Sequence, residues 1–144
     1  AKVARRFGVN PKVAMLSFSN FGTGEELRTD RIEEAIEIVR EMEPGLIIDG
    51  PMQADTALVP EIQKDYPFMS FDGAANVLIC PNLASANIAY KLLQRIAGAE
   101  MTGPILEGLS SPAHVLQRRD SVRDVVHMAA ICSVDAQRKS RERL

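Results

Sequence analysis

Residues 30–50 read DRIEEAIEIVREMEPGLIIDG, and this stretch decides the fold. Apolar residues recur at helical spacing, while Asp30 and Glu33 can form a capping box, so we expect a helix that ends near Glu43. The expected buried face of this helix consists of Ile32, Ala35, Ile36, Val39 and Met42. A Pro-Gly pair ends the helix, and residues 46–49 follow as a short buried strand. An amphipathic helix next to a buried strand is typical of an α/β fold.

Short apolar strands and amphipathic helices alternate along the rest of the chain. Further strands are expected at residues 13–18 and 76–80, and further helices at 1–8, from Gly50-Pro51 onward, from about Ser85 to Ile96, and from Val122 onward. The helix that ends at Ile96 should turn an apolar face inward, formed by Ile88, Ala89, Leu92, Leu93 and Ile96. Residues 60–75 are expected to form a helix tail and an exposed connection. The alternation predicts an α/β sheet layered with helices.

Composition limits the class of protein. The chain has 144 residues, of which 46% are hydrophobic and 25% are charged, so it can bury the core of one globular domain. Its net charge of -2 argues against nucleic acid as a partner. No apolar run is long enough to span a membrane, and residues 1–10 lack the apolar core of a secretory signal, which makes the cytoplasm the expected location. Because the chain does not begin with Met, we expect it to be a segment of a longer protein.

The cysteines and histidines are assigned no chemistry. Cys80 lies in a strand pattern and Cys132 in a helix pattern, and both are expected to be buried free thiols. His114 and His127 have no second ligand at metal-binding spacing, so we predict no metal site. The basic tail, residues 137–144, is expected to complement the dipole of the last helix and to fray.

Polar residues follow two of the expected strands, at the end where open α/β sheets bind ligands. The loop SFSNFGTG at residues 17–24 can hold an oxyanion with backbone N–H groups, and an ordinary glycine-rich connection explains it equally well. Asp49, Gln53 and Asp55 cluster at the turn where the next strand ends. Capping and hydrogen bonding explain these three side chains as well as ligand binding does.

A third group of polar residues precedes the last expected helix. Ser121 is a good N-cap residue and Asp124 can complete a capping box with it. The positive end of the helix then faces a turn formed by Gln117, Arg118 and Arg119, where a phosphate or a coenzyme pyrophosphate would bind well. The local pattern alone favours a simpler interpretation, in which Asp124 only caps the helix and the arginines are solvated.

Four longer segments carry a resemblance to a known family. They are SFSNFG (17–22), IDGPMQAD (48–55), NVLICPNLASANIAYKLLQ (76–94) and GPILEGLSSPAHVLQRRDSVRDVVHMAA (103–130). In this order they resemble the C-terminal part of a phosphate acetyltransferase, over nearly all of residues 9–137. Within that family the chain is most similar to the phosphotransacetylase-like C-terminal domain of bacterial hybrid NADP-dependent malic enzymes. The finer resemblance is carried by SNFG, PNLASANIAY, PAHVLQR and AAICSVDAQ.

The family's catalytic pattern is altered in this chain. Active phosphotransacetylases carry Ser-Arg-Gly before the last helix and Asp within it, and the resemblance places Gln117, Arg118, Arg119 and Asp124 at these positions. In such enzymes the Asp helps to deprotonate the coenzyme A thiol, while Arg and Ser stabilise the acyl phosphate and the developing charge. Gln117 and Arg119 are bulkier than Ser and Gly. The resemblance therefore implies that the chain still binds an acyl-CoA or acyl phosphate but no longer transfers the acyl group.

The resemblance also implies a fold with two lobes. Residues 1–115 would form the second lobe of a phosphotransacetylase fold, akin to isocitrate and isopropylmalate dehydrogenases, with a three-layer arrangement of helices on both faces of a sheet. Residues 116–144 would form the site turn and a C-terminal helix that packs on the missing first lobe. The loop after the first strand borders the family's cleft, which adds Ser19, Asn20 and Gly22 to the candidate ligand residues. Family members pair through this lobe, so we expect at least a homodimer.

Three functions remain open. The first, which we favour, is a regulatory and oligomerisation domain of an NADP-dependent malic enzyme, with acetyl-CoA as the allosteric effector. This segment would hold no cofactor, whereas NADP and a divalent metal would bind to N-terminal malic enzyme domains. The second is an active phosphate acetyl- or butyryltransferase, against which Gln117 argues. The third is a structural dimerisation module without ligands.

Overall fold

The computed structural model describes residues 1–22 and 30–141, which leaves Thr23 and Gly24 of the predicted loop outside the described residues. The chain divides into two compact units, Ala1–Lys91 and Leu92–Leu144. In chain order the elements are α1 (Lys2–Arg6), β1 (Lys12–Leu16), α2 (Asp30–Met42), β2 (Ile47–Met52), α3 (Ala54–Leu58), α4 (Pro60–Gln63), β3 (Val77–Ile79), α5 (Leu83–Ile96) and α6 (Val122–Arg141). The α/β class is confirmed.

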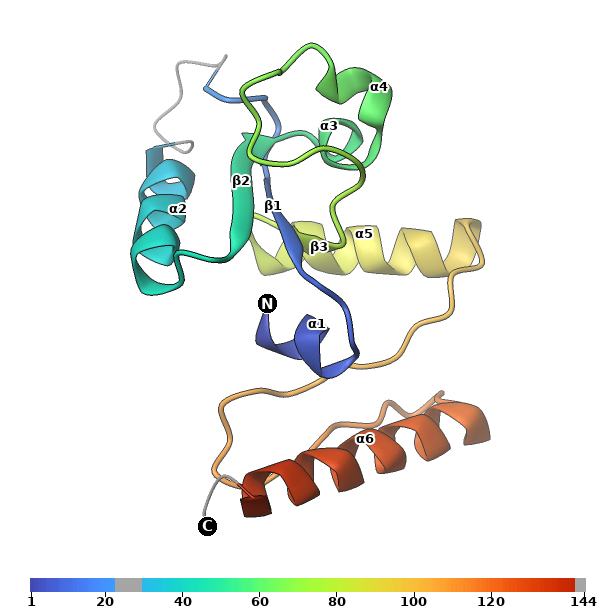
Figure 1. Cartoon of the computed structure of the whole chain (residues 1–144). Helices are drawn as coiled ribbons and strands as arrows, with labels where there is room; N and C mark the ends of the chain where they lie inside the picture. Colours follow the sequence, from blue (N-terminus) through green and yellow to red (C-terminus); the bar gives the residue numbers. More distant parts are fainter. Residues whose placement is uncertain (23–29, 142–144) are drawn as a thin grey trace. The chain divides into compact units, whose positions relative to one another are not determined.

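Three parallel strands in the order β2-β1-β3 form the sheet of the first unit (Figure 1). The central strand is β1, where Val13 is in register with Ile48 of β2 and with Val77 of β3. The chain passes from β1 through α2 to β2 on one side and then returns to form β3 on the other side of β1, so the direction of winding reverses after β2. This strand order is that of a doubly wound sheet.

Side chains alternate along β1 between the two faces of the sheet. Val13 packs with Ile36 of α2 and Ile48 of β2 on one face. Ala14 packs on the opposite face, in a second buried cluster. The other buried members of that cluster are Met52, Ala57, Phe71 and Ala75. With α2 on one face and α3 on the other, the predicted three-layer arrangement is confirmed (Figure 1).

The prediction for α2 is confirmed in its extent and in most of its buried face. Ile36 is 2% exposed, and Ile32 and Val39 pack beside it against the sheet. Met42 is 80% exposed, so its assignment to the core was wrong. The physical reason is that Met42 is the last residue of α2, beyond the turns that contact the sheet.

The predicted start of a helix at Gly50-Pro51 was wrong, because β2 continues through these residues to Met52. Pro51 is tolerated since β2 is an edge strand of the three-stranded sheet, and a prolyl residue there removes no essential ladder bond. Its carbonyl accepts a hydrogen bond from the Phe21 amide at 2.7 Å. Gly50 has φ of 137°, and a Cβ there would lie 2.6 Å from the Met15 carbonyl oxygen. Only glycine fits at this bend.

The prediction that residues 60–75 form an exposed connection was wrong for its second half. Phe71 and Ala75 are 8% and 6% exposed, respectively, and both pack with Met52 and Ala57. The Ala75 amide also donates to the carbonyl of Ala57 at 2.8 Å. These residues were misassigned because they cover the second face of the sheet without forming a regular element, so they show no periodicity.

The helix α5 begins at Leu83 and is capped by Asn82, whose Oδ1 accepts the Ser85 amide at 2.9 Å. The predicted inward face of this helix was wrong. Ile88, Leu92, Leu93 and Ile96 are 61%, 51%, 53% and 81% exposed, and Ala89 is exposed as well. The sequence period located the apolar stripe correctly, but it does not reveal what covers that stripe.

Residues 137–141 of the basic tail belong to α6, so fraying was wrong for this part, and residues 142–144 lie outside the described residues. Lys139 donates a hydrogen bond to the carbonyl of Leu109, which ties the last turns of the helix to the preceding segment. Cys80 and Cys132 are free thiols, as predicted, but they are half-buried rather than buried. The Cys132 thiol contacts the carbonyl of Pro112 instead of an apolar core.

Candidate functional site

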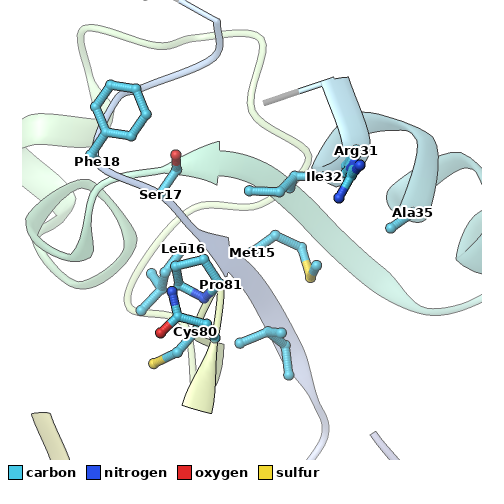
Figure 2. A pocket seen from close by; sticks show the side chains of 11 residues that line it. Met15, Leu16, Ser17, Phe18, Arg31, Ile32, Ala35, Cys80 and Pro81 are labelled. Atoms are coloured by element: carbon cyan, nitrogen blue, oxygen red, sulfur yellow. The ribbon is translucent and has the colours of Figure 1, made fainter. Parts of the chain in front are cut away.

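A pocket of about 780 Å³ lies where β1 and β3 end (Figure 2). Its lining consists of Met15, Leu16, Ser17, Phe18, Arg31, Ile32, Ala35, Ile79, Cys80, Pro81 and Asn82. The first four end β1 and continue into the loop after it, the last four do the same for β3, and the remaining three belong to the first two turns of α2. The pocket is therefore built by three segments that are far apart in the sequence.

This position has a physical explanation in the winding of the sheet. In an open α/β sheet, two neighbouring parallel strands can be followed by connections that run in opposite directions. A crevice then forms between the carboxyl ends of these strands, and ligands bind there. The strands β1 and β3 are such a pair. The N-terminal turn of α2 at the same edge contributes a positive partial charge. The walls of the crevice combine this positive partial charge with Met, Leu and Ile side chains. An anionic ligand with an apolar part would therefore fit.

Sequence reasoning missed Arg31 as a site residue. Its side chain is exposed and lines the pocket from the first turn of α2 (Figure 2). A cation at the start of a helix is unfavourable, because the helix dipole is positive at that end. This misplaced charge was the signal that could have identified Arg31, since a bound anion would offset the repulsion.

Asn20 holds the loop after β1 against the start of α3. Its Oδ1 accepts the amide of Gln53 at 2.7 Å, and its Nδ2 donates to Tyr66 Oη at 3.1 Å and to Gln53 Oε1 at 3.3 Å. The Gln53 side chain in turn donates to the Phe18 carbonyl at 2.7 Å. Asn20 therefore shapes the rim of the pocket through Phe18, because both ends of its amide are used within the fold.

Ser19 and Gly22 complete the described part of this loop. Ser19 is 8% exposed, and its Oγ is buried with no hydrogen-bond partner among the described residues. A buried hydroxyl in this state is uncommon, and a ligand or an ordered water usually completes its bonding. Gly22 is exposed and has φ of 74°, a conformation that favours glycine. Ser19 directly follows the pocket-lining pair Ser17 and Phe18, and Gly22 lies three residues further along the same loop.

The polar cluster formed by Asp49 of β2 and by Gln53 and Asp55 after it hydrogen-bonds mainly with the backbone. Asp49 is 8% exposed and accepts the amides of Gly50 at 2.9 Å and Ser70 at 2.6 Å. Asp55 accepts the amide of Thr56 at 2.8 Å. With Gln53 engaged by the loop, these three side chains follow the capping and hydrogen-bonding interpretation of the sequence. Among the residues that the structure describes, no group of three His, Cys, Asp or Glu side chains could hold a metal ion.

The second candidate group lies in the other unit, at the start of α6. Gln117 to Asp120 form a tight turn, in which the Asp120 amide donates to the Gln117 carbonyl at 3.1 Å and Asp120 Oδ2 accepts the Gln117 amide at 2.6 Å. The predicted turn before the helix is thus confirmed. Arg118 and Arg119 occupy its two central positions and are exposed. Neither guanidinium forms an ion pair with a described residue, which leaves both able to meet an anion.

The predicted capping box at the start of α6 is confirmed. Asp124 Oδ2 accepts the Ser121 amide at 2.8 Å and the Ser121 hydroxyl at 2.7 Å, while Ser121 Oγ accepts the Asp124 amide at 3.3 Å. The hydroxyl and the amide of Ser121 lower the pKa of the Asp124 carboxyl below its ordinary value; desolvation opposes this, and His127 and Arg123 add to it. A carboxylate held in this way is a poor proton acceptor.

Replacement of Ser121 by Ala should lower the free energy of unfolding by about 1 kcal/mol, because the N-cap hydroxyl is lost. Denaturant unfolding measures this change. Ser133→Ala is the matched control, since Ser133 is an exposed serine in the interior of the same helix. Its expected effect is within about 0.5 kcal/mol. Equal losses in the two variants would contradict the capping role.

Acid should remove the stabilisation that the Asp124 charge provides. Its pKa is lower in the folded state, so the contribution is complete above the unfolded pKa and is lost as pH falls through the folded value. The unfolding free energies of the wild type and Asp124→Asn should differ most near neutral pH and converge below about pH 4. Denaturant unfolding at a series of pH values measures this convergence. A difference that stays constant with pH would contradict it.

The third arginine near this turn is already engaged. Arg123 donates from Nη1 to Glu100 Oε1 at 2.8 Å and from Nη2 to Glu100 Oε2 at 3.0 Å. Both side chains are mostly exposed, so this ion pair contributes little to stability. It does occupy the edge of the guanidinium, whose two N–H donors a phosphate would use. Arg118 and Arg119 are therefore the available cations of the turn.

Sequence reasoning also missed a buried polar pair in this unit. His114 and Asp135 approach within 3.1 Å, and their side chains are 4% and 9% exposed. They are too far apart in the sequence for a local pattern to reveal the contact.

Across the described ranges, no helix has the length and apolar character that a membrane crossing needs.

Residues 1–133 match the phosphate acetyl/butaryl transferase family. The chain belongs to this family. Relatives include the NADP-dependent malic enzyme of Salmonella typhimurium, 47% identical over 140 residues, which are 95% of this chain and 18% of that enzyme. The phosphate acetyltransferase of Acetivibrio thermocellus is 47% identical over 131 residues, which are 90% of this chain and 40% of that enzyme. The predicted resemblance to both classes is confirmed.

Solved structures of family members confirm the fold. The phosphotransacetylase of Streptococcus pyogenes superimposes with a TM-score of 0.89 at 40% identity, over 96% of this chain and 42% of that one. The EutD phosphotransacetylase of Staphylococcus aureus gives 0.85 at 40% identity, over 94% and 42%. This member of the family thus spans about a fifth of the malic enzyme and about two-fifths of the phosphotransacetylases.

Proposed function

We propose that this chain is the regulatory and oligomerisation domain of an NADP-dependent malic enzyme and that it binds acetyl-CoA as an allosteric effector. The sequence identity of 47% to the Salmonella typhimurium malic enzyme supports the assignment of the chain to such an enzyme. An N-terminal part would then bind NADP and a divalent metal and would oxidise and decarboxylate malate. In this arrangement residues 1–115 act as the second lobe, and residues 116–144 supply the site turn and a helix for the first lobe.

The turn before α6 carries the proposal for the ligand. Arg118 and Arg119 present two unpaired guanidinium groups within the described residues, next to the positive end of α6. A phosphate or pyrophosphate of a coenzyme would receive charge-assisted hydrogen bonds from these groups. Gln117 would add a neutral amide donor at the same turn. In the first unit, the loop that contains Ser19, Asn20 and Gly22 follows the pocket-lining residues Ser17 and Phe18 and is proposed as a separate region for ligand contacts.

The absence of acyl transfer is proposed from two features of this turn and one of the first turn of α6. Gln117 offers an amide where active enzymes have a Ser hydroxyl, and Arg119 places a bulky cation where they have glycine. Asp124 would be the thiol base, but its carboxylate is engaged by Ser121 and its pKa is lowered. A weak base and a narrowed turn favour binding over catalysis.

Allosteric control requires that acetyl-CoA bind two states of the enzyme with different affinity. In the full-length protein, malate oxidation can be followed as NADPH formed while acetyl-CoA is varied. We expect the rate at subsaturating malate to change by at least about fivefold, the lower range of measured allosteric couplings. A rate that does not respond to saturating acetyl-CoA would contradict the regulatory function.

The second candidate is an active phosphate acetyltransferase. The Acetivibrio thermocellus enzyme of that name is as similar in identity as the malic enzyme, so identity does not separate the two candidates. In that function a phosphate oxygen attacks the thioester carbonyl, the C–S bond breaks and coenzyme A leaves as the thiolate. Formation of acetyl phosphate from acetyl-CoA and phosphate at ordinary enzymatic rates would establish it. A ligand-free dimerisation module, the third candidate, predicts no effect of acetyl-CoA on either activity.

A further inference from the structure

The segment before the candidate turn is anchored to the middle of α6 by a buried histidine. His114 Nε2 and Asp135 Oδ2 lie 3.1 Å apart, and the side chains are 4% and 9% exposed. The backbone amide of Leu106 donates to His114 Nδ1 at 3.3 Å. Because Nδ1 accepts this bond, it carries no proton in the neutral ring, and the proton is on Nε2. His114 then donates to the Asp135 carboxylate while it accepts from the backbone.

This arrangement connects two parts of the second unit. Leu106 and His114 belong to the segment that leads into the Gln117–Arg119 turn, whereas Asp135 belongs to α6, the helix that also carries Asp124. Asp135 lies about 20 Å along α6 from Val122 at a rise of about 1.5 Å per residue. The chain from His114 to Ser121 reaches about 25 Å at most. Little slack therefore remains between the anchored histidine and the start of the helix.

We propose that the His114–Asp135 pair positions the Gln117–Arg119 turn at the start of α6 and thereby sets the affinity for an acyl-CoA. This proposal rests on the proposed function of the turn. The turn itself is exposed and its own contacts are local, so they fix its shape but not its distance from the rest of the helix. The buried pair supplies that fixed point. His114 and Asp135 are positioning residues, since neither belongs to the turn that meets the ligand.

The test compares acetyl-CoA affinity in the full-length protein and its variants by calorimetric titration. His114→Leu and Asp135→Leu should each weaken binding by about tenfold, a loss typical of residues that orient a ligand-binding group through another residue. The double variant should be no weaker than either single variant, since both remove the same interaction. Asp135→Asn keeps an oxygen that accepts the Nε2 proton, so it should restore the affinity to within about threefold of the wild type.

Met128→Ala is the matched control for loss of stability. Met128 is 5% exposed on the same helix, and its replacement removes buried volume without removing a polar contact to residues 106–114. It should lower Tm and leave the affinity unchanged. Unchanged affinity in His114→Leu, or an equal loss of affinity in Met128→Ala, would overturn the positioning role. A wild-type protein that does not bind acetyl-CoA would contradict the proposed function itself, and with it this proposal.

Discussion

Arg118→Ala should weaken the binding of acetyl-CoA by about 30-fold to 100-fold, equivalent to about 2–3 kcal/mol. The guanidinium is exposed, unpaired among the described residues, and placed at the positive end of α6, so a coenzyme phosphate would gain a charge-assisted and bidentate contact from it. Lysine cannot reproduce the planar fork, and Arg118→Lys should retain only part of the affinity. Calorimetric titration of the full-length protein measures both losses.

Arg141→Ala is the matched control for Arg118→Ala. Arg141 is an exposed arginine at the opposite end of the same helix, so its replacement changes the net charge equally. It should leave the affinity for acetyl-CoA within about twofold of the wild type, because long-range charge effects are screened at physiological salt. If the two variants lose affinity equally, general electrostatic attraction explains the binding, and the role assigned to Arg118 is wrong.

Met52→Ala should lower the free energy of unfolding by about 3 kcal/mol, because it removes a fully buried side chain. Met52 is 0% exposed and belongs to the cluster that joins the sheet to α3 and to Phe71 and Ala75. Close packing leaves a cavity when the side chain is truncated, and this cavity adds to the lost transfer free energy. Denaturant unfolding of both proteins measures the difference.

Met42→Ala provides the matched control for Met52→Ala, since the chemical change is identical. Met42 is 80% exposed at the end of α2, and its truncation should change the unfolding free energy by less than about 0.5 kcal/mol. A large loss in Met42→Ala would show that this side chain is covered in the folded protein. A small loss in Met52→Ala would contradict the assignment of the core.

The parts of the fold that depend on local periodicity were predictable. The helical spacing of α2 and the apolar run of β1 give the same elements in the sequence and in the structure. Errors occurred where packing between distant segments overrides local signals. Gly50 and Pro51 have the composition of a helix start, yet they continue β2 because that strand lies at the sheet edge. Phe71 and Ala75 are buried without periodicity, so no pattern could assign them to the core.

The candidate site also has local features that the sequence predicts and non-local features that it does not. The capping box of Ser121 and Asp124 and the turn before it are local, and the sequence predicted both. The pocket between the ends of β1 and β3 is not local, because its walls come from three separate segments. Arg31 enters it only through the position of α2 beside the sheet, and the pairing of His114 with Asp135 depends on how the chain folds back on α6. Such contacts require the structure.

We propose that this member of the family binds acetyl-CoA without transferring its acetyl group. The most direct test is a calorimetric titration of acetyl-CoA into the full-length protein, with acetyl phosphate formation measured on the same sample in the presence of phosphate. We predict saturable binding to the wild-type protein and no acetyl phosphate above the uncatalysed background. Acetyl phosphate formed at ordinary enzymatic rates, or no binding at all, would contradict the claim.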